Sequence, residues 1–313
     1  MEASPYMPPD APEWNAFVDQ STNGTFLHNR GYMDYHSDRF TDASLIVRDA
    51  SHKVVALFPA SRHGATAVSH GGLTYGGLIV GQRHHATALH LEAWDAILDN
   101  LRRSGISELI YKPVPSIYCR YPSDDDLYAL FRSGAQLLWT QVASALPLSE
   151  PLLFNRSART AASHARRHGV SVAESDNLDA FWQMLEQVLM QHHGATPAHS
   201  LDEMRLLRSR FPQEIRLFTA AGADGALLGG ILAYFTGCVA HCQYIAVNDA
   251  GRRAKVLALI AEHIIKNECG DKAWFDFGTS CEDSGRVLNA SLNEQKYRMG
   301  GRPVAYTAWR LKL

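Results

Sequence analysis

The chain has 313 residues, 46% of them hydrophobic, so it can bury a sizeable core as one large domain or two medium ones. Its formal net charge of -2 argues against a general nucleic-acid or membrane-surface protein, although a local basic groove remains compatible with it. Five scattered cysteines without a CxxC pair indicate free thiols in a reducing compartment and argue against a structural zinc site.

The N-terminal residues MEASPYMPPDAPEW lack a basic run followed by an apolar core. No apolar stretch reaches the roughly 18 residues that a membrane span needs. We therefore expect a cytoplasmic protein without a membrane span.

The first half of the chain predicts an α/β unit. Helices are predicted around Trp14 and Phe17 and over 25–40, 86–104 and 124–134, and strands over 43–48, 53–59, 73–80, 108–112 and 137–148. The glycine-rich SHGGLTYGG, residues 69–77, lies where the backbone must bend or approach something closely, with His70 and Tyr75 supplying polar groups. A phosphate-binding GxxxxGK[ST] loop is absent.

The next segment, NRSARTAASHARRHG, concentrates arginines. On a helix Arg159 and Arg166 lie about two turns apart on one face. They form either a solvated face or a clamp for a phosphorylated substrate or an RNA backbone, because guanidinium forks suit phosphate oxygens.

A helix over 178–191 runs into the loop HHGATPAHS, which gathers three imidazoles. Ser200 is the predicted N-cap of the following helix, with Glu203 as its capping-box partner. The histidine spacing fits no helical metal motif, so we expect no metal and interpret His193 and His199 as hydrogen-bonding groups at a cleft edge.

The second half predicts strands over 215–220, 227–235, 239–247 and 274–277, with a helix over 255–266 before the last. The order strand, turn, strand, strand, helix, strand therefore occurs twice, and His70 and His241 fall in similar places. Two copies predict two subdomains, 1–150 and 151–313, with a cleft between them. Within HCQYIAV, alternation puts His241 and Gln243 on one strand face and Tyr244 on the other.

The segment WFDFGTSCEDSGRVLNASLNEQKYRMGG predicts a buried strand that carries Asp276 at its end. A polar loop with Ser280 follows, and Asn289 opens a short helix containing Lys296. We interpret this segment as the floor of an active site, the alternative being an ordinary strand and surface loop. The DFG triplet does not indicate a kinase, since the HRD and ATP-binding loops are missing.

The doubled order resembles the N-acetyltransferase (GNAT) superfamily, and specifically its double-domain Fem-like branch, the FemAB and FemX type. The resemblance covers nearly the whole chain and rests on RSARTAASHARRHGVSV, HGATPAHSLDEMRLLRSRFP, HCQYIAV, WFDFGTS and LNASLNEQKYRMGGR. It implies an α/β fold of two tandem GNAT-like subdomains, each a mixed sheet flanked by helices. It also places Lys296 at the lysine that Fem ligases carry in this segment.

Such proteins transfer an acyl or aminoacyl group from acyl-CoA or aminoacyl-tRNA to an amine, so no tightly bound cofactor is implied. The acetyl-CoA signature [RQ]xxGx[GA] should fall within NDAGRRAKVLAL, where only Gly251, Arg252 and Arg253 are available. This departure makes aminoacyl-tRNA, or an acyl group on a carrier, a serious competitor to acetyl-CoA as donor.

The expected reaction is amide formation on an amine of a small, cell-surface or secondary-metabolite precursor. Lys296 would stabilise the oxyanion or leaving group, and Asp276, or His241 in its place, would take the amine proton. The expected acceptor-binding residues are His70, Tyr75, His199, Gln243, Tyr244, Ser280 and Asn289, and the expected donor-binding residues are Arg159, Arg166, Arg252 and Arg253. The alternative is a non-catalytic protein of this fold that binds a glycan precursor or RNA.

Overall fold

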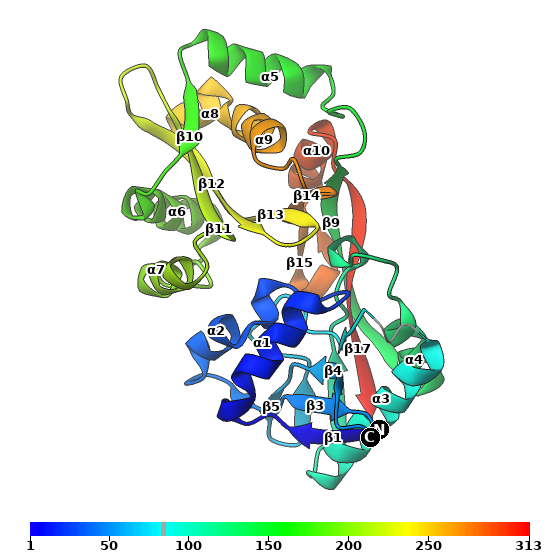
Figure 1. Ribbon diagram of the computed structural model, residues 1–313. Coiled ribbons are helices and arrows are strands. Elements are labelled where there is room, and N and C mark those ends of the chain that lie inside the picture. The colour runs from blue at the N-terminus through cyan, green and yellow to red at the C-terminus, as the bar shows by residue number, and fades with distance from the viewer. Residues whose placement is uncertain (83–85) are drawn as a thin grey trace. The chain divides into compact units, whose positions relative to one another are not determined.

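The structure, a computed structural model, describes residues 1–82 and 86–313, without the side chains of His192 and His193. The chain divides into two compact units. Unit 1 comprises Met1–Gln141, Asp283–Gly285 and Ala305–Leu313, and unit 2 comprises Val142–Glu282 and Arg286–Val304. The N- and C-terminal residues both belong to unit 1 (Figure 1). No helix within the described ranges has both the length and the apolarity to cross a bilayer.

Unit 1 contains two groups of short strands. One is a four-stranded sheet with the order β1 (Glu2–Pro5), β3 (Leu45–Arg48), β4 (Val54–Phe58) and β7 (Ile79–Val80). In the other, β8 (Glu108–Tyr111) pairs antiparallel with β17 (Arg302–Lys312) and parallel with β6 (Thr66–Val68), followed by β5 (Ser61–His63) and β2 (Thr41–Asp42). Its helices are α1 (Ala11–Gln20), α2 (Arg30–Met33), α3 (Thr87–Arg103) and α4 (Asp125–Arg132).

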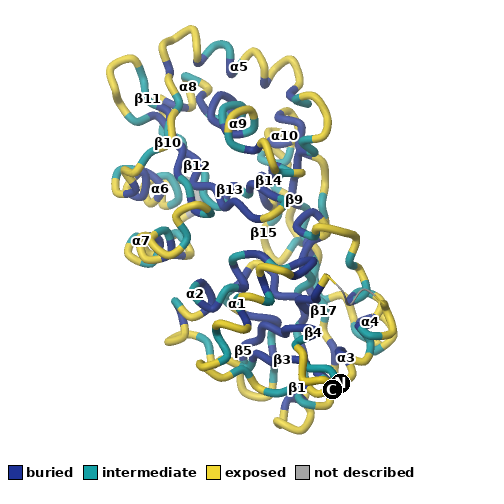
Figure 2. The backbone as a smooth tube through the Cα atoms, in the orientation of Figure 1, coloured by how far each residue is buried: buried dark blue, intermediate teal, exposed yellow. Residues whose placement is uncertain are grey.

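The core of unit 1 lies where α3 packs on β1, β3 and β4. The apolar positions Trp94, Ile97, Leu98 and Leu101 recur at helical spacing, so they form one buried stripe on α3. Figure 2 shows β3 and β4 mostly in dark blue, whereas buried and exposed positions alternate along α3. The predicted helix 86–104 and the predicted strands 43–48, 53–59 and 108–112 are confirmed.

Three predictions that involve unit 1 are wrong. Residues 25–40 form three short pieces, Phe26–His28, α2 and Asp34–His36, because Asn29 is extended and caps α2 with its own side chain. The predicted strand 73–80 shrinks to β7, since the glycine-rich segment before it turns instead of extending. His70 lies in one of these turns at φ +48°, whereas His241 lies within a strand. The prediction that the two histidines occupy similar places is therefore wrong.

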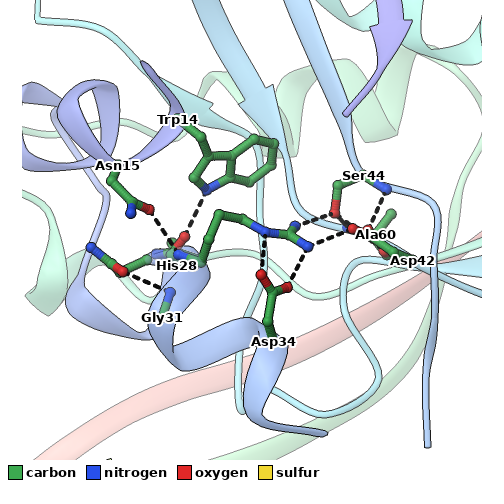
Figure 3. Close-up of polar contacts among 10 residues, drawn as sticks. Trp14, Asn15, His28, Gly31, Asp34, Asp42, Ser44 and Ala60 are labelled. Carbon is green, nitrogen blue, oxygen red and sulfur yellow. Dashed lines mark hydrogen bonds and ion pairs between the residues drawn. The ribbon is translucent and has the colours of Figure 1, made fainter. Parts of the chain in front are cut away.

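A buried arginine holds the N-terminal elements of unit 1 together (Figure 3). The Arg30 guanidinium donates to Asp34 and Asp42 at 2.5 Å each and lies 3.8 Å from the centre of the Tyr6 ring. Trp14 donates its indole N–H to the carbonyl of His28 at 2.7 Å. The charge of Arg30 is thus matched by carboxylates of its own unit.

His28 is fully buried, and its Nδ1 accepts a hydrogen bond from the Thr25 amide at 3.0 Å. Burial lowers the pKa of His28 to about 4. As pH falls below about 6.5, His28 becomes protonated in the unfolded chain, whereas in the folded chain it stays neutral down to about pH 4. We therefore predict that stability falls by about 3 kcal/mol on acidification across this window.

Urea unfolding at pH 7.5 and at pH 4.5 measures this loss. His28→Gln should show a shallower dependence on pH than the wild type, and His63→Gln, at an exposed position, should match the wild type. Equal pH dependence in the two variants would contradict the prediction.

Unit 2 is built on one sheet with the strand order β10 (Ser171–Glu174), β11 (Ile215–Ala221), β12 (Leu227–Phe235), β13 (Val239–Val247), β14 (Trp274–Thr279) and β9 (Gln136–Pro147). All pairs are antiparallel except β13 with β14. One face carries the main core under α5 (Arg156–Arg167) and α9 (Val256–Asn267). The helices α6 (Leu178–His193) and α7 (Leu201–Arg210) also pack on the strands (Figure 1).

Most predictions for unit 2 are confirmed, including β12 and β13 at both ends, the Ser200–Glu203 capping box and the Asn289 cap of α10 (Ala290–Arg298). The short helix α8 (Asp249–Ala254) was not predicted. The strands β15 (Cys281–Glu282) and β16 (Val287–Leu288) form a small hairpin.

The predicted alternation along β13 holds only as far as Cys242. Ala233 pairs with Cys242 and Leu232 with Tyr244, so Gln243 is the extra residue of a β-bulge. Cys242 and Ile245 therefore both pack into the main core, and Tyr244 lies on the same strand face as His241. The sequence-based assignment of Tyr244 to the opposite face from His241 is wrong for this reason.

Candidate active site

A histidine and a carboxylate meet where β13 and β14 run side by side. The two strands pair only over Val239–His241 and Trp274–Asp276, which puts His241 next to Asp276. His241 Nδ1 lies 2.8 Å from Asp276 Oδ2, and Asp276 Oδ1 accepts the Gly278 amide at 2.8 Å. Asp276 is fully buried, whereas the His241 side chain is 17% exposed.

This contact with Asp276 leaves Nε2 as the ring nitrogen of His241 that does not bond the carboxylate. A carboxylate at Asp276 accepts hydrogen bonds, so the neutral tautomer of His241 that fits this contact has its proton on Nδ1 and a lone pair on Nε2. Gly278 has φ +73°, and a Cβ there would lie 3.3 Å from the imidazole Cε1. The positive φ and the close approach explain why the strand leaves the site at a glycine.

Lys296 lies at the same strand end. It projects from α10, and its ammonium donates to the carbonyls of Gly278 at 3.0 Å and Thr279 at 2.5 Å. Burial lowers the pKa of Lys296 to about 8, although the nearby Asp276 charge favours the ammonium form. Two of the three ammonium protons are therefore used in hydrogen bonds to the backbone that follows Asp276.

Ser280 and Asn289 support this strand end. Ser280 is buried, and its hydroxyl has no hydrogen-bond partner within the described part of the chain. The Asn289 amide donates to the Ser280 carbonyl at 2.9 Å, and the Asn289 side chain accepts from Leu292 as the cap of α10. Asn289 thus orients the helix that carries Lys296.

Tyr244 and His199 form a second polar pair of unit 2. The Tyr244 hydroxyl accepts the His199 amide at 3.2 Å and lies 2.7 Å from His199 Nδ1. Burial raises the pKa of Tyr244, while these hydrogen bonds act in the opposite direction. Gln243, the bulge residue, is half-buried.

Trp182 is a neighbour of the candidate residue Tyr244 that the sequence did not indicate. Its ring packs edge-on against Tyr244 with centroids 5.3 Å apart. Its indole N–H is buried and has no acceptor among the residues that the structure describes. In sequence it reads as one of several apolar residues of α6, so no local signal could have marked it.

His70 and Tyr75 belong to unit 1. His70 is buried and stacks on His36 with ring centroids 5.2 Å apart. The buried Tyr75 hydroxyl donates to Thr25 Oγ1 at 3.4 Å, and its ring lies 4.7 Å from that of Tyr118. The other candidates for acceptor binding belong to unit 2.

The candidate donor-binding arginines differ in their surroundings. Arg159 and Arg253 are exposed, whereas Arg166 pairs with Glu262 at 2.7 Å. A cavity of about 280 Å³ beside this pair is lined by Arg166, Val170, Val172, Leu259, Glu262, His263, Lys266 and Asn267, so no other candidate residue borders it. Arg252 Nε donates to the Val247 carbonyl at 3.3 Å.

The start of α8 is occupied by the chain itself. The Asn248 side chain accepts the Gly251 amide at 2.8 Å, and a Cβ at Gly251 would lie 2.0 Å from the Leu228 carbonyl oxygen. Over the described ranges, no three His, Cys, Asp or Glu side chains gather in a way that would hold a metal ion.

Comparisons with known proteins agree with the doubled architecture. Residues 154–284 match the family model of the acetyltransferase (GNAT) domain. The structure of FemX has a TM-score of 0.73 at 14% identity, covering 100% of this chain and 98% of that one. L-PGS from Bacillus licheniformis gives 0.63 at 10%, covering 99% and 93%. A tandem GNAT protein from the clavulanic acid biosynthesis pathway gives 0.54 at 14%, covering 99% and 98%. A search of curated protein sequences finds no match.

Proposed function

Since the chain has the double-GNAT fold of the Fem-like proteins, we propose that it is an N-acyltransferase that forms an amide from an activated acyl or aminoacyl donor and an amine. The observation that carries this proposal is the His241–Asp276 pair beside Lys296 at the end of β14. Histidine, carboxylate and ammonium supply a base, its orienting partner and a positive charge.

In the proposed reaction the acceptor amine attacks the acyl carbon directly. A C–N bond forms, the carbon–oxygen or carbon–sulfur bond to the donor breaks, and the leaving group takes a proton. His241 Nε2 accepts the amine proton. Asp276 cannot touch substrate, because it is fully buried and both its oxygens are engaged, so it acts by positioning His241. Lys296 supplies positive charge for the oxyanion, and no cysteine takes part.

We propose a phosphate-bearing donor with the order of preference aminoacyl-tRNA, then acyl-CoA or an acyl carrier. Arg159 and Arg253 are exposed, so their guanidinium groups are open to phosphate oxygens. The Gly251 amide at the start of α8, which would otherwise face a pyrophosphate, is already bound by Asn248. Donors of these kinds are cytoplasmic molecules, so a cytoplasmic location is part of the proposal.

The proposed acceptor is an amine of a small, cell-surface or secondary-metabolite precursor. The bulge at Gln243 places Tyr244 one step beyond His241 on the same strand face, about 7 Å along the strand. His199, bonded to Tyr244, and the buried hydroxyl of Ser280 are the other proposed acceptor contacts in unit 2.

A second candidate is a non-catalytic protein of this fold that binds a glycan precursor or RNA. It is favoured by the engagement of Lys296 with two backbone carbonyls and of Tyr244 with His199, contacts that also suit a purely structural role. The two candidates differ in whether any donor is consumed.

The test is a transfer assay on the purified protein with charged tRNA mixtures, acyl-CoA species and acyl carrier proteins, each combined with amino-sugar and peptide amines. Mass spectrometry should detect an acceptor that has gained one acyl group. Binding of an acceptor or RNA without transfer from any donor would favour the second candidate.

A further inference from the structure

The glycine-rich turn of unit 1, residues 69–77, is held by hydrogen bonds to a single lysine, Lys112. The Lys112 amide donates to Ser69 Oγ at 2.7 Å, and the Lys112 carbonyl accepts from Gly76 at 3.1 Å and Gly77 at 2.8 Å. The ammonium of Lys112 donates to the Leu73 carbonyl. The lysine therefore holds the start, the middle and the end of the turn.

No acidic side chain among the described residues forms an ion pair with Lys112, whose ammonium bonds a backbone carbonyl instead. Lys112 is half-buried, and burial lowers its pKa to about 8. Arg30 differs, since Asp34 and Asp42 pair with it, and Lys296 differs, since Asp276 acts on it. Burying an ammonium group without a counter-charge costs folding free energy, and a bound anionic ligand would offset that cost.

His70 adds a strained, incompletely bonded group to the same turn. It is 4% exposed, has φ +48°, and its buried Nδ1 has no hydrogen-bond partner in the part of the chain that is described. Burial lowers the pKa of His70 to about 3, and the positive charge of Lys112 acts in the same direction. Left-handed backbone at a non-glycine residue is retained where the surrounding structure needs it, often at a ligand site.

The glycines show that the turn is closely packed rather than loose. A Cβ at Gly71 would lie 2.9 Å from the Phe40 ring, and one at Gly72 would lie 2.0 Å from His36 Nε2. The strain at His70 is thus imposed by a fixed environment, which keeps the imidazole and Lys112 in place before any ligand binds.

We propose that this turn, with Lys112 and His70, is a binding site for a small anionic group, a phosphate or a carboxylate. The anion accepts hydrogen bonds from the Lys112 ammonium and from the neutral imidazole. It arrives either as a free anion or as part of a larger molecule. The proposed anion site lies within unit 1, and anion binding there does not require the protein to be an acyltransferase.

Isothermal titration calorimetry on the full chain tests the site with inorganic phosphate, citrate and glucose 6-phosphate. Lys112→Met should weaken binding by roughly tenfold or more, because a hydrogen-bonded charge is lost. Lys53→Met, the same substitution at an exposed position of unit 1, should bind as the wild type does. Equal binding of phosphate and glucose 6-phosphate indicates a free anion, and binding of glucose 6-phosphate alone indicates a group on a larger ligand.

The pH dependence is a second readout. Binding should weaken as pH rises through about 8, since the free Lys112 ammonium loses its proton there, and Lys112→Met should lose this dependence. His70→Asn provides a variant that tolerates the left-handed backbone, so it should fold even if Lys112→Met does not, and it should also bind more weakly. Absence of wild-type binding for all three probes at about 10 mM, or binding unchanged in either folded variant, would overturn the proposal.

Discussion

His241→Gln should lower kcat/KM for acyl transfer by roughly 10²- to 10⁴-fold, the range that positioned general bases contribute. The variant loses the lone pair of Nε2 but keeps a polar side chain beside Asp276, so we expect an intact fold by circular dichroism. Steady-state kinetics with the donor found by the transfer assay measures the effect. His63→Gln, an exposed histidine of unit 1, is the matched control and should retain activity.

Asp276→Asn separates a positioning role from a merely structural one. An asparagine amide donates to Nδ1, which forces the proton onto Nε2 and removes the base, as a wrong tautomer does in other histidine–carboxylate pairs. Added imidazole should restore part of the activity to His241→Gln and not to a variant that is simply unfolded. Full activity in either folded variant would refute the assignment of His241 as base.

Lys296→Met should lower transfer by roughly 10²- to 10³-fold, the loss expected when one charge that stabilises the oxyanion is removed. The wild type should also lose activity as pH rises through about 8, because the ammonium of Lys296 is then deprotonated. Lys296→Arg should move this descending limb to higher pH, since a guanidinium stays charged. The measurement is a profile of kcat/KM between about pH 6.5 and 9.5.

A purely structural Lys296 predicts a different pattern. In that case Lys296→Met would lower Tm by releasing the carbonyls of Gly278 and Thr279, while the folded fraction would keep wild-type kcat. Lys266→Met, at a largely exposed lysine of α9, is the control for the substitution itself. Retained transfer in a folded Lys296→Met variant would contradict a catalytic role.

Strand β13 shows which features the sequence pattern predicts correctly and which it does not. The bounds of β12 and β13 were predicted to the residue, because long apolar runs between glycines and polar turns leave little choice of register. The face of Tyr244 was predicted wrongly, because a bulge depends on how the neighbouring strand β12 pairs and not on any local residue. The same applies to Trp182, whose contact with Tyr244 exists only after α6 has packed on β13.

In unit 1 the sequence pattern predicted regular elements where the chain forms turns and short helical pieces. The turn at residues 69–77 was expected to extend into a strand, yet its hydrogen bonds go to Lys112, more than 30 residues away along the chain. No sequence window contains both partners, so Lys112 gave no signal. Residues 25–40 likewise have enough apolar positions for a helix, but the capping side chain of Asn29 breaks them into short pieces.

The sequence by itself determined the doubled α/β order, the capped helices and the occurrence of Asp276 and Lys296 around one strand end, because local periodicity and capping act over a few residues. Only the tertiary structure decided that Asp276 is fully buried beside His241 and that Tyr244 shares the strand face of His241. It also decided that Lys112 bonds a strained turn and has no acidic partner among the described residues. These contacts join residues distant in the chain, and burial, strand pairing and charge compensation are properties of the folded state alone.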